Sequence, residues 1–285
     1  MQTKKKKKKK KKRKRNPRSD GDIDSIRLLD LHNEGYVRYF SGHSDKVTCL
    51  SLSPGSDSFV SCSKDDTVAL WDLNSRNAQG KLKLAAPYLA VFDPSASVIA
   101  IGSQSTSSIL LYDVRNYDKS PFSTFDLAPY EEVYTPAPRE RAWTRLEFSN
   151  DGKHLLVGTD YHGHFVLDAF EGRMEAFLVG RPGPPNRASP KSMSSSSKPP
   201  SSGDVCFSQD GRYVLGGSGD HSADVLVWDL HQTPDASSFL QPMARLPGRG
   251  HTPLIECNPR YNMLATADKD VFFWLPEETP KAEDK

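Results

Sequence analysis

Residues Gly42–Asp72 read GHSDKVTCLSLSPGSDSFVSCSKDDTVALWD, a stretch that begins with Gly-His and ends with Trp-Asp. Between these pairs lie three short runs of apolar and β-branched residues, separated by turn-forming Ser-Pro-Gly and Lys-Asp-Asp. Runs of this kind, bounded by such turns, are typical of β-strands. The stretch therefore predicts three consecutive strands joined by tight turns.

The Trp-Asp pair recurs along the chain, intact or with its aromatic residue replaced. The equivalent positions are Leu29-Asp30, Trp71-Asp72, Tyr112-Asp113, Leu167-Asp168, Trp228-Asp229 and Trp274. From Asp30 the steps between the aspartates are 42, 41, 55 and 61 residues, and the two long steps contain insertions at 128–141 and 181–203. Without these insertions the period is about 40 residues, the length of a four-stranded blade in WD-repeat propellers.

The pattern predicts an all-β fold with very little helix. We expect a WD-repeat β-propeller of the seven-bladed family with about five blades present, as an open or incomplete ring. Residues 23–278 form the propeller, 1–22 a disordered basic tail and 279–285 a C-terminal tail. Either residues 36–40 close a five-bladed ring, or about two N-terminal blades are missing, which is the alternative we favour. An incomplete ring exposes sheet edges.

The paired dipeptides are interpreted as structural groups rather than catalytic ones. By resemblance to WD-repeat blades, His43 bonds toward Asp65, and a strand hydroxyl of Ser61 or Ser63 together with the Trp71 indole completes a polar network. A satisfied network of this kind fixes one geometry, because unpaired buried groups are costly. The last unit repeats part of it, with these residues: His251, Thr266, Asp268 and Trp274.

Charge is distributed very unevenly along the chain. Residues 4–15 are twelve consecutive basic side chains, whereas the remainder carries 26 basic and 36 acidic residues and a net charge near −10. An acidic body is not typical of a nucleic-acid-binding domain, so nucleic acid is expected to bind only indirectly or through the tail. The run is a candidate nuclear signal or RNA anchor, or else a disordered tail without either role. Its candidate signal residues are Lys4, Lys12, Arg13, Lys14 and Arg15.

Other local features favour ordinary structural roles. The four cysteines lie in apolar runs without a CxxC pair, which predicts buried thiols in a reducing compartment. We expect His162 and His164 to be an exposed pair rather than a metal site, and the stretch with Tyr130, Glu131, Glu132 and Tyr134 to be uncommitted surface. Ser189 precedes a proline and is a candidate phosphorylation site in a solvated loop.

No enzyme motif is found in the sequence. It has no Gly-x-Ser-x-Gly elbow, no Gly-rich phosphate loop leading into a helix and no HExxH, so we expect no catalytic residues and no cofactor. No apolar stretch reaches the ~18 residues of a membrane span, and the N-terminus lacks the apolar segment of a secretory signal. We therefore expect a soluble intracellular protein.

Several stretches together resemble one family. They include IRLLDLHNEGYVRYFSGHSDKVTCLSLSP, LWDLNSRNAQGKLKL, YDVRNYDKSPFSTFDL, WTRLEFSNDGKHLLVGT, DAFEGRMEAF and the terminal FWLP. From about Ile23 to Pro276 the chain is similar to the small WD-repeat subunit shared by the COMPASS histone H3 lysine-4 methyltransferase complex and the cleavage-and-polyadenylation machinery. It departs from that family in having a lysine run where the family has further N-terminal propeller sequence.

The resemblance implies a non-catalytic nuclear adaptor. Its expected partners are the methyltransferase catalytic subunit, cleavage and polyadenylation factor subunits, and the RNA polymerase II tail. Two alternatives are also compatible with the sequence: another WD-repeat scaffold, such as a ubiquitin-ligase substrate receptor, or an RNA-binding protein that acts through its basic tail.

Overall fold

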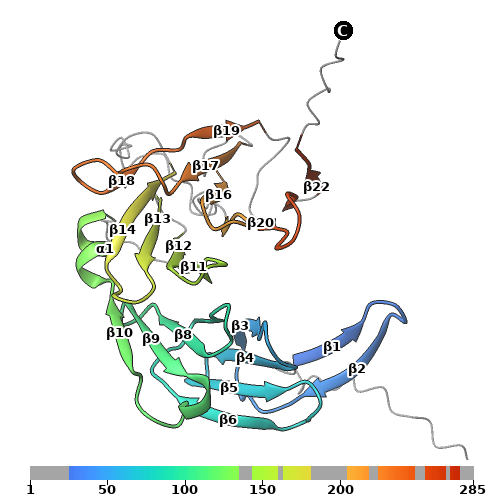
Figure 1. Cartoon of the computed structure of the whole chain (residues 1–285). Helices are drawn as coiled ribbons and strands as arrows, with labels where there is room; N and C mark the ends of the chain where they lie inside the picture. Colours follow the sequence, from blue (N-terminus) through green and yellow to red (C-terminus); the bar gives the residue numbers. More distant parts are fainter. Residues whose placement is uncertain are drawn as a thin grey trace, which may run out of the picture.

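The computed structural model describes residues 26–134, 143–159, 163–180, 204–217, 224–247, 254–267 and 270–276. Within these ranges the chain forms six β-sheets, which follow one another along an open arc (Figure 1). We name them blades A to F in chain order. The prediction of an all-β repeat protein is confirmed: one α-helix and one short 3₁₀ helix accompany the strands in the described ranges.

Blades B and C are complete four-stranded antiparallel sheets. Blade B comprises β3 (Val47–Leu52), β4 (Ser58–Ser63), β5 (Thr67–Asp72) and β6 (Ala78–Lys83). Blade C comprises β7 (Leu89–Phe92), β8 (Val98–Ser103), β9 (Ser108–Asp113) and β10 (Ser123–Asp126), with the 3₁₀ helix η1 (Val114–Asn116) after β9. In both blades, strands adjacent in sequence are neighbours in the sheet, as tight turns require.

Blades D and E repeat the same order. Blade D comprises β11 (Trp143–Phe148), β12 (His154–Thr159), β13 (Gly163–Asp168) and β14 (Met174–Val179). Blade E comprises β15 (Val205–Phe207), β16 (Tyr213–Gly217), β17 (Val225–Asp229) and β19 (Ala244–Leu246). The short strand β18 (Phe239–Leu240) leaves blade E and pairs in parallel with β14, so blade D has a fifth strand.

The expected loop insertion at 128–141 begins with a helix, α1 (Ala128–Tyr134). The interpretation of its acidic and aromatic residues as uncommitted surface is wrong for Glu131 and Tyr134, whereas Glu132 is exposed as expected. Glu131 is buried, and Tyr134 packs edge-to-face on Phe165 while its hydroxyl donates to the Ser237 carbonyl at 2.8 Å. One helical turn is enough to place these side chains on the same face, where they cover blade D.

The two blades at the ends of the arc are smaller. Blade A contains β1 (Ile26–Asp30) and β2 (Gly35–Phe40), and blade F contains β20 (Leu254–Cys257), β21 (Leu264–Ala267) and β22 (Val271–Trp274). Strand β2 pairs with β1 and lies far from β22 (Figure 1). Closure of a five-bladed ring by residues 36–40 is therefore not what the structure shows, and the arc is open in the described residues.

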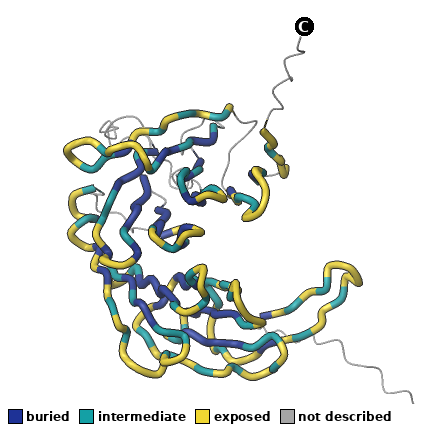
Figure 2. Tube along the Cα trace, in the orientation of Figure 1, coloured by how far each residue is buried: buried dark blue, intermediate teal, exposed yellow. Residues whose placement is uncertain are grey.

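The core lies between consecutive blades rather than inside any one of them. The middle strands β4, β8 and β12 are buried on both faces over five consecutive residues, because each has a blade on either side. By contrast, β21 alternates buried and half-buried positions, as a strand covered on one face does. Figure 2 shows the same difference, with buried chain concentrated in the middle strands of the interior blades and little of it in the two end blades.

The helix α1 has seven residues, and none of the described helices is long and apolar enough to cross a lipid bilayer.

Candidate functional site

Blade B contains a chain of hydrogen bonds that links the loop before its first strand to its third strand. The Trp71 indole N–H donates to Ser61 Oγ at 2.8 Å, and Ser61 Oγ lies 2.7 Å from His43 Nε2. On the other side of the ring, His43 Nδ1 lies 3.2 Å from Asp65 Oδ2. Because a carboxylate only accepts, Nδ1 carries the proton and Nε2 accepts from the Ser61 hydroxyl. The side chains of His43, Ser61 and Trp71 are essentially fully buried.

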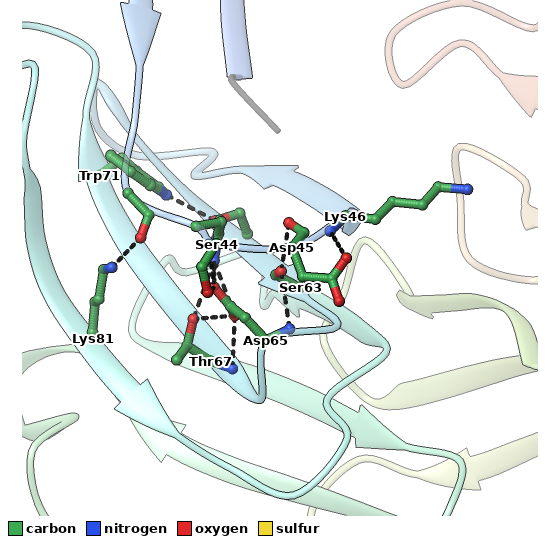
Figure 3. Close-up of polar contacts among 11 residues, drawn as sticks. Ser44, Asp45, Lys46, Ser63, Asp65, Thr67, Trp71 and Lys81 are labelled. Atoms are coloured by element: carbon green, nitrogen blue, oxygen red, sulfur yellow. Dashed lines mark hydrogen bonds and ion pairs between the residues drawn. The ribbon is translucent and has the colours of Figure 1, made fainter. Parts of the chain in front are cut away.

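Asp65 holds the turn between β4 and β5 together (Figure 3). Its carboxylate accepts from the Ser44 backbone N–H at 2.8 Å, from the Thr67 N–H at 3.1 Å and from the Thr67 hydroxyl at 2.5 Å. Burial alone would raise the pKa of Asp65, but the bonds from Thr67, Ser44 and His43 outweigh it and hold the pKa well below its usual range. The carboxylate is therefore charged whenever the blade is folded near neutral pH.

The sequence left two hydroxyls open for this network, and the structure separates their roles. Ser61 is the group between His43 and Trp71. Ser63 instead donates to the Asp45 carbonyl at 3.0 Å and accepts from the Asp65 N–H at 3.2 Å. Residues 61 and 63 lie on the same face of the strand, so strand periodicity alone does not separate their roles. They differ in their distance from the turn.

The Trp-Asp markers occupy one position in every complete blade. Trp71 and Trp228 pair with Phe59 and Val214, the residues of the second strand that face them across the ladder. Tyr112 and Leu167 do the same in blades C and D, and Trp274 does so in blade F, with partners Ile99, Leu155 and Leu264. The indoles of Trp71 and Trp228 are thus at equivalent places in their modules.

The second-strand residue two positions after the partner of the marker tryptophan determines whether the indole N–H has a hydrogen-bond acceptor. In blade F this residue is Thr266, whose hydroxyl accepts from the Trp274 indole at 2.9 Å, as Ser61 does in blade B. In blade E it is Gly216, and the buried Trp228 indole N–H has no partner within the described part of the chain. A Cβ at Gly216 would lie 3.1 Å from the Trp228 ring, so the ring occupies the space of the missing side chain.

This difference predicts unequal effects of the same substitution. Trp71→Phe removes a donor that is bonded to Ser61, whereas Trp228→Phe removes one that is unpaired, and both leave a similar void beside a phenyl ring. We expect Trp71→Phe to lower the free energy of unfolding by about 1 kcal/mol more than Trp228→Phe, the net value of one hydrogen bond. Urea denaturation of the two variants and the parent measures the difference. Equal losses would contradict the assignment.

The predicted network of the last unit is described only in part. Thr266 and Trp274 are brought together, but His251 and Asp268 lie outside the described residues. So do the candidate nuclear-signal residues, Ser189 and His162.

His164 corrects an expectation. It is completely buried rather than exposed, and its Nδ1 accepts from the Thr159 N–H at 3.1 Å. Its ring meets Trp228 of blade E edge-on, at 6.0 Å between centroids. Burial lowers the pKa of His164 to about 4, so the ring is neutral and serves as an interface side chain. The described residues contain no group of three or more His, Cys, Asp or Glu that could hold a metal ion.

A second buried network joins blades C and D, and no sequence motif predicts it. Glu131 of α1 is 2% exposed and accepts from the Trp143 indole at 2.8 Å and from the Ser107 hydroxyl at 2.5 Å. Trp143 starts the first strand of blade D and is not a repeat marker. The signal available was the placement of Glu131 one helical turn from Tyr134 and Leu127, which gives the segment an apolar face.

The inner side of the arc carries an arginine that contacts three blades. Arg145 lies on β11, and its Nε is 3.1 Å from Glu147 Oε2 of the same strand. Its Nη1 is 3.4 Å from Asp204 Oδ2 at the start of blade E, and its Nη2 is 2.8 Å from Glu256 Oε2 of β20. Burial raises the pKa of Glu147 to about 7, although Arg145 opposes the shift. Burial also raises the pKa of Asp204. One guanidinium thus faces three carboxyl groups, an arrangement that favours protonation of one of them.

This cluster predicts a pH-dependent stability. The folded-state pKa of Glu147 lies above the unfolded value, so folding favours the protonated carboxyl group. The stabilisation of the folded state by this proton is complete below pH ~4.5 and is lost as the pH rises through about 7. We expect Glu147→Gln, which keeps an acceptor for Arg145, to flatten the fall in stability over this range and to be more stable than the parent at pH 8. The upper limit of the gain is about 3 kcal/mol. Thermal melting from pH 5 to 8 measures it, and parallel curves for the two proteins would contradict the prediction.

Comparison with known proteins identifies the family. The model named "WD domain, G-beta repeat" matches residues 35–72, which include the blade B network. WD repeat-containing protein 82 of Drosophila melanogaster is 37% identical over 256 residues, covering 89% of this chain and 70% of the fly protein. COMPASS component SWD2 of Saccharomyces cerevisiae is 33% identical over 258 residues, covering 89% of this chain and 71% of the yeast protein. The chain belongs to this WD-repeat family.

Set1 complex component swd2 of Schizosaccharomyces pombe, another protein of the Swd2 and WD repeat-containing protein 82 family, is 30% identical over 285 residues, covering 90% of this chain and 76% of the yeast protein. Membership of the family agrees with a WD-repeat β-propeller architecture, and no name among these relatives indicates an enzyme.

Proposed function

We propose that this protein is a non-catalytic scaffold subunit of a COMPASS-type, Set1-type complex. The observation that carries the proposal is its membership of the family whose relatives are named as components of such complexes. The architecture supports it, because blades packed face to face form a rigid frame that presents loops and edges to protein partners. The work of the chain is then to bind and position other subunits.

The finer assignments follow from the same resemblance. The partner is the catalytic subunit of a histone H3 lysine-4 methyltransferase, and the compartment is the nucleus. Cleavage and polyadenylation factor subunits and the RNA polymerase II tail are further partners of a family subunit shared between complexes. A WD-repeat scaffold has no need of a cofactor, since it contributes surface and not chemistry.

Affinity purification tests the complex. The tagged chain is purified from nuclease-treated extract of its own cells, and co-purifying proteins are quantified by mass spectrometry alongside histone H3 lysine-4 methyltransferase activity. We expect a Set1-type methyltransferase and its activity to be enriched at least tenfold over an untagged control. Enrichment of ubiquitin-ligase subunits instead, or loss of all partners on nuclease treatment, would overturn the proposal in favour of the two alternatives.

The compartment has a separate test. A fluorescent fusion lacking residues 1–18 is compared with the full chain, because the twelve basic residues at 4–15 are the candidate import signal. We expect the deletion to shift the fusion from nucleus to cytoplasm. Unchanged nuclear import removes the signal role from the basic run.

A further inference from the structure

Two thiols meet at the junction between blades E and F. Cys206 lies on β15 and Cys257 on β20, and their sulfur atoms are 3.4 Å apart. The two residues are 51 positions apart in the sequence, in different repeats, so no CxxC motif announces them. Both are free cysteines, and the Cys206 S–H donates to the Cys257 sulfur. The fold therefore creates a dithiol that local sequence does not show.

The packing of the junction holds the two sulfurs together. Strands β15 and β20 are the first strands of adjacent blades, and their side chains share a small apolar cluster. Its buried members are Cys206, Val225, Ile255 and Leu264, and Cys257 packs against them. Arg145 also ties the two blades together, because its ion pairs with Asp204 and Glu256 lie one or two residues from the thiols. The position of the pair is thus set by several contacts.

The sulfur contact is remote from the outer edges of both blades. Neighbouring strands of a sheet are about 4.8 Å apart, so the fourth position of a blade is roughly 14 Å from its first strand. Cys206 and Cys257 both lie on first strands and meet across the facing sides of those strands. Their contact therefore belongs to the junction of blades E and F alone.

The two thiols differ in exposure. Cys206 is 1% exposed, whereas Cys257 is half-buried and keeps part of its surface in contact with solvent. The bond to Cys257 and burial both stabilise the neutral Cys206 thiol, which raises its pKa well above the usual value. The thiolate is the form that attacks an oxidant, and an oxidised cysteine is then resolved by a neighbouring thiol. Cys257 is accordingly the group that reacts first, and Cys206 the group that resolves the product.

We propose that Cys206 and Cys257 form a reversible oxidation site, which hydrogen peroxide converts to a disulfide between blades E and F. The Cys257 thiolate attacks one peroxide oxygen and breaks the O–O bond, which gives a sulfenic acid and one water. The Cys206 sulfur then attacks the Cys257 sulfur, and the hydroxyl group leaves as a second water with the Cys206 proton. Two thiols thus lose two electrons to one peroxide, and the products are one disulfide and two waters.

The reaction needs only a small movement. A disulfide bond is about 2.05 Å long, so the sulfurs have to approach by about 1.4 Å, a shift that side-chain rotation provides. Because the thiols are already held together, the second step is intramolecular and is favoured over reaction with other thiols. The product links two repeats and restricts the unfolded chain, so it stabilises the folded protein. Oxidation would therefore stiffen one junction of the scaffold, whichever complex the protein joins.

Peptide mapping tests the linkage. The reduced full-length protein, freed of reductant, is treated with hydrogen peroxide at pH 7; remaining thiols are alkylated and the digest is analysed by mass spectrometry. We expect the peptides of Cys206 and Cys257 to become disulfide-linked in most molecules, and dithiothreitol to reverse the linkage. The link should form at least tenfold faster than any disulfide of Cys49, whose sulfur instead bonds to the Ala90 backbone.

A matched pair of variants separates the disulfide from other oxidation. Cys257→Ala removes one thiol of the pair, whereas Cys49→Ala removes another half-buried thiol and leaves the pair intact. Both changes are small, so both variants are expected to fold, which circular dichroism checks. We expect peroxide to raise the melting temperature of the parent and of Cys49→Ala by about 5 °C or more. The melting temperature of Cys257→Ala should not rise.

Four results would overturn the proposal. Cys206 and Cys257 could remain thiols in peroxide-treated folded protein, or Cys257 could be oxidised to sulfinic acid without linkage, so that Cys206 is not a resolving thiol. A disulfide between two copies of the chain, seen as a dimer on a non-reducing gel, would contradict the intramolecular step. An equal rise in melting temperature in the parent and Cys257→Ala would show that the stabilisation does not come from this bond.

Discussion

Replacing Asp65 by alanine is expected to lower the free energy of unfolding by about 3 kcal/mol, because hydrogen bonds to a charged group are worth about 1.5–3 kcal/mol each and partners are left buried. The carboxylate accepts from the Ser44 and Thr67 backbone and lies 3.2 Å from the buried His43 ring. Without it, His43 Nδ1 keeps only Thr67 Oγ1, at 3.1 Å, as a neighbour. Urea denaturation at pH 7 measures the loss.

The exposed Asp57 in the preceding turn of blade B is the matched control, and Asp57→Ala should change stability by no more than about 0.5 kcal/mol. The loss at Asp65 should also depend on pH. Its folded-state pKa is depressed, so its stabilisation is present above the unfolded pKa and declines as the pH falls through that value and below. The gap between parent and Asp65→Ala should therefore narrow from pH 5 to pH 3. A loss below 1 kcal/mol at pH 7, or a gap independent of pH, would contradict the network.

Much of the fold was predictable because each repeat is recognisable from residues that lie close together in the sequence. Turn residues and short apolar runs locate strands, and the spacing of Trp71, Tyr112, Leu167 and Trp228 sets the period; these residues occupy one register in the ladders. Such signals depend on neighbours in sequence, which is why a single chain reveals them. The pairing of His43 with Asp65 was accessible for the same reason, since both lie within one repeat.

The features that sequence reasoning missed join different repeats. His164 is buried because blade E covers it, and Glu131 because Trp143 and Ser107 of two blades point at it. Arg145 likewise meets carboxylates from blades D, E and F, 59 and 111 residues apart in two of the three contacts. No local pattern encodes which blade faces which, so a charged residue in a Pro-rich insertion looks like surface. Its burial follows from packing alone.

Glu131 provides the sharpest test of that packing. Glu131→Ala removes the acceptor for the Trp143 indole, which is 1% exposed and has nowhere else to donate without reaching solvent, and for the Ser107 hydroxyl. A buried donor left without a partner costs about 1–3 kcal/mol. Because Glu131→Ala leaves two such donors, the Trp143 indole N–H and the Ser107 hydroxyl, we expect the free energy of unfolding to fall by about 3 kcal/mol in total. Glu131→Gln keeps one acceptor oxygen and should recover part of the loss.

Glu132, the next residue of the same helix, is exposed and supplies the control. Glutamate and alanine both favour helix, so Glu132→Ala keeps the helical propensity of α1 and should leave stability within about 0.5 kcal/mol of the parent. Urea denaturation of each variant and the parent, followed by far-ultraviolet circular dichroism, measures the change. If Glu131→Ala and Glu132→Ala were equally harmless, Glu131 would not be the residue that fastens α1 between blades C and D, and the burial of that helix would have to rest on Tyr130 and Tyr134 packing against the core.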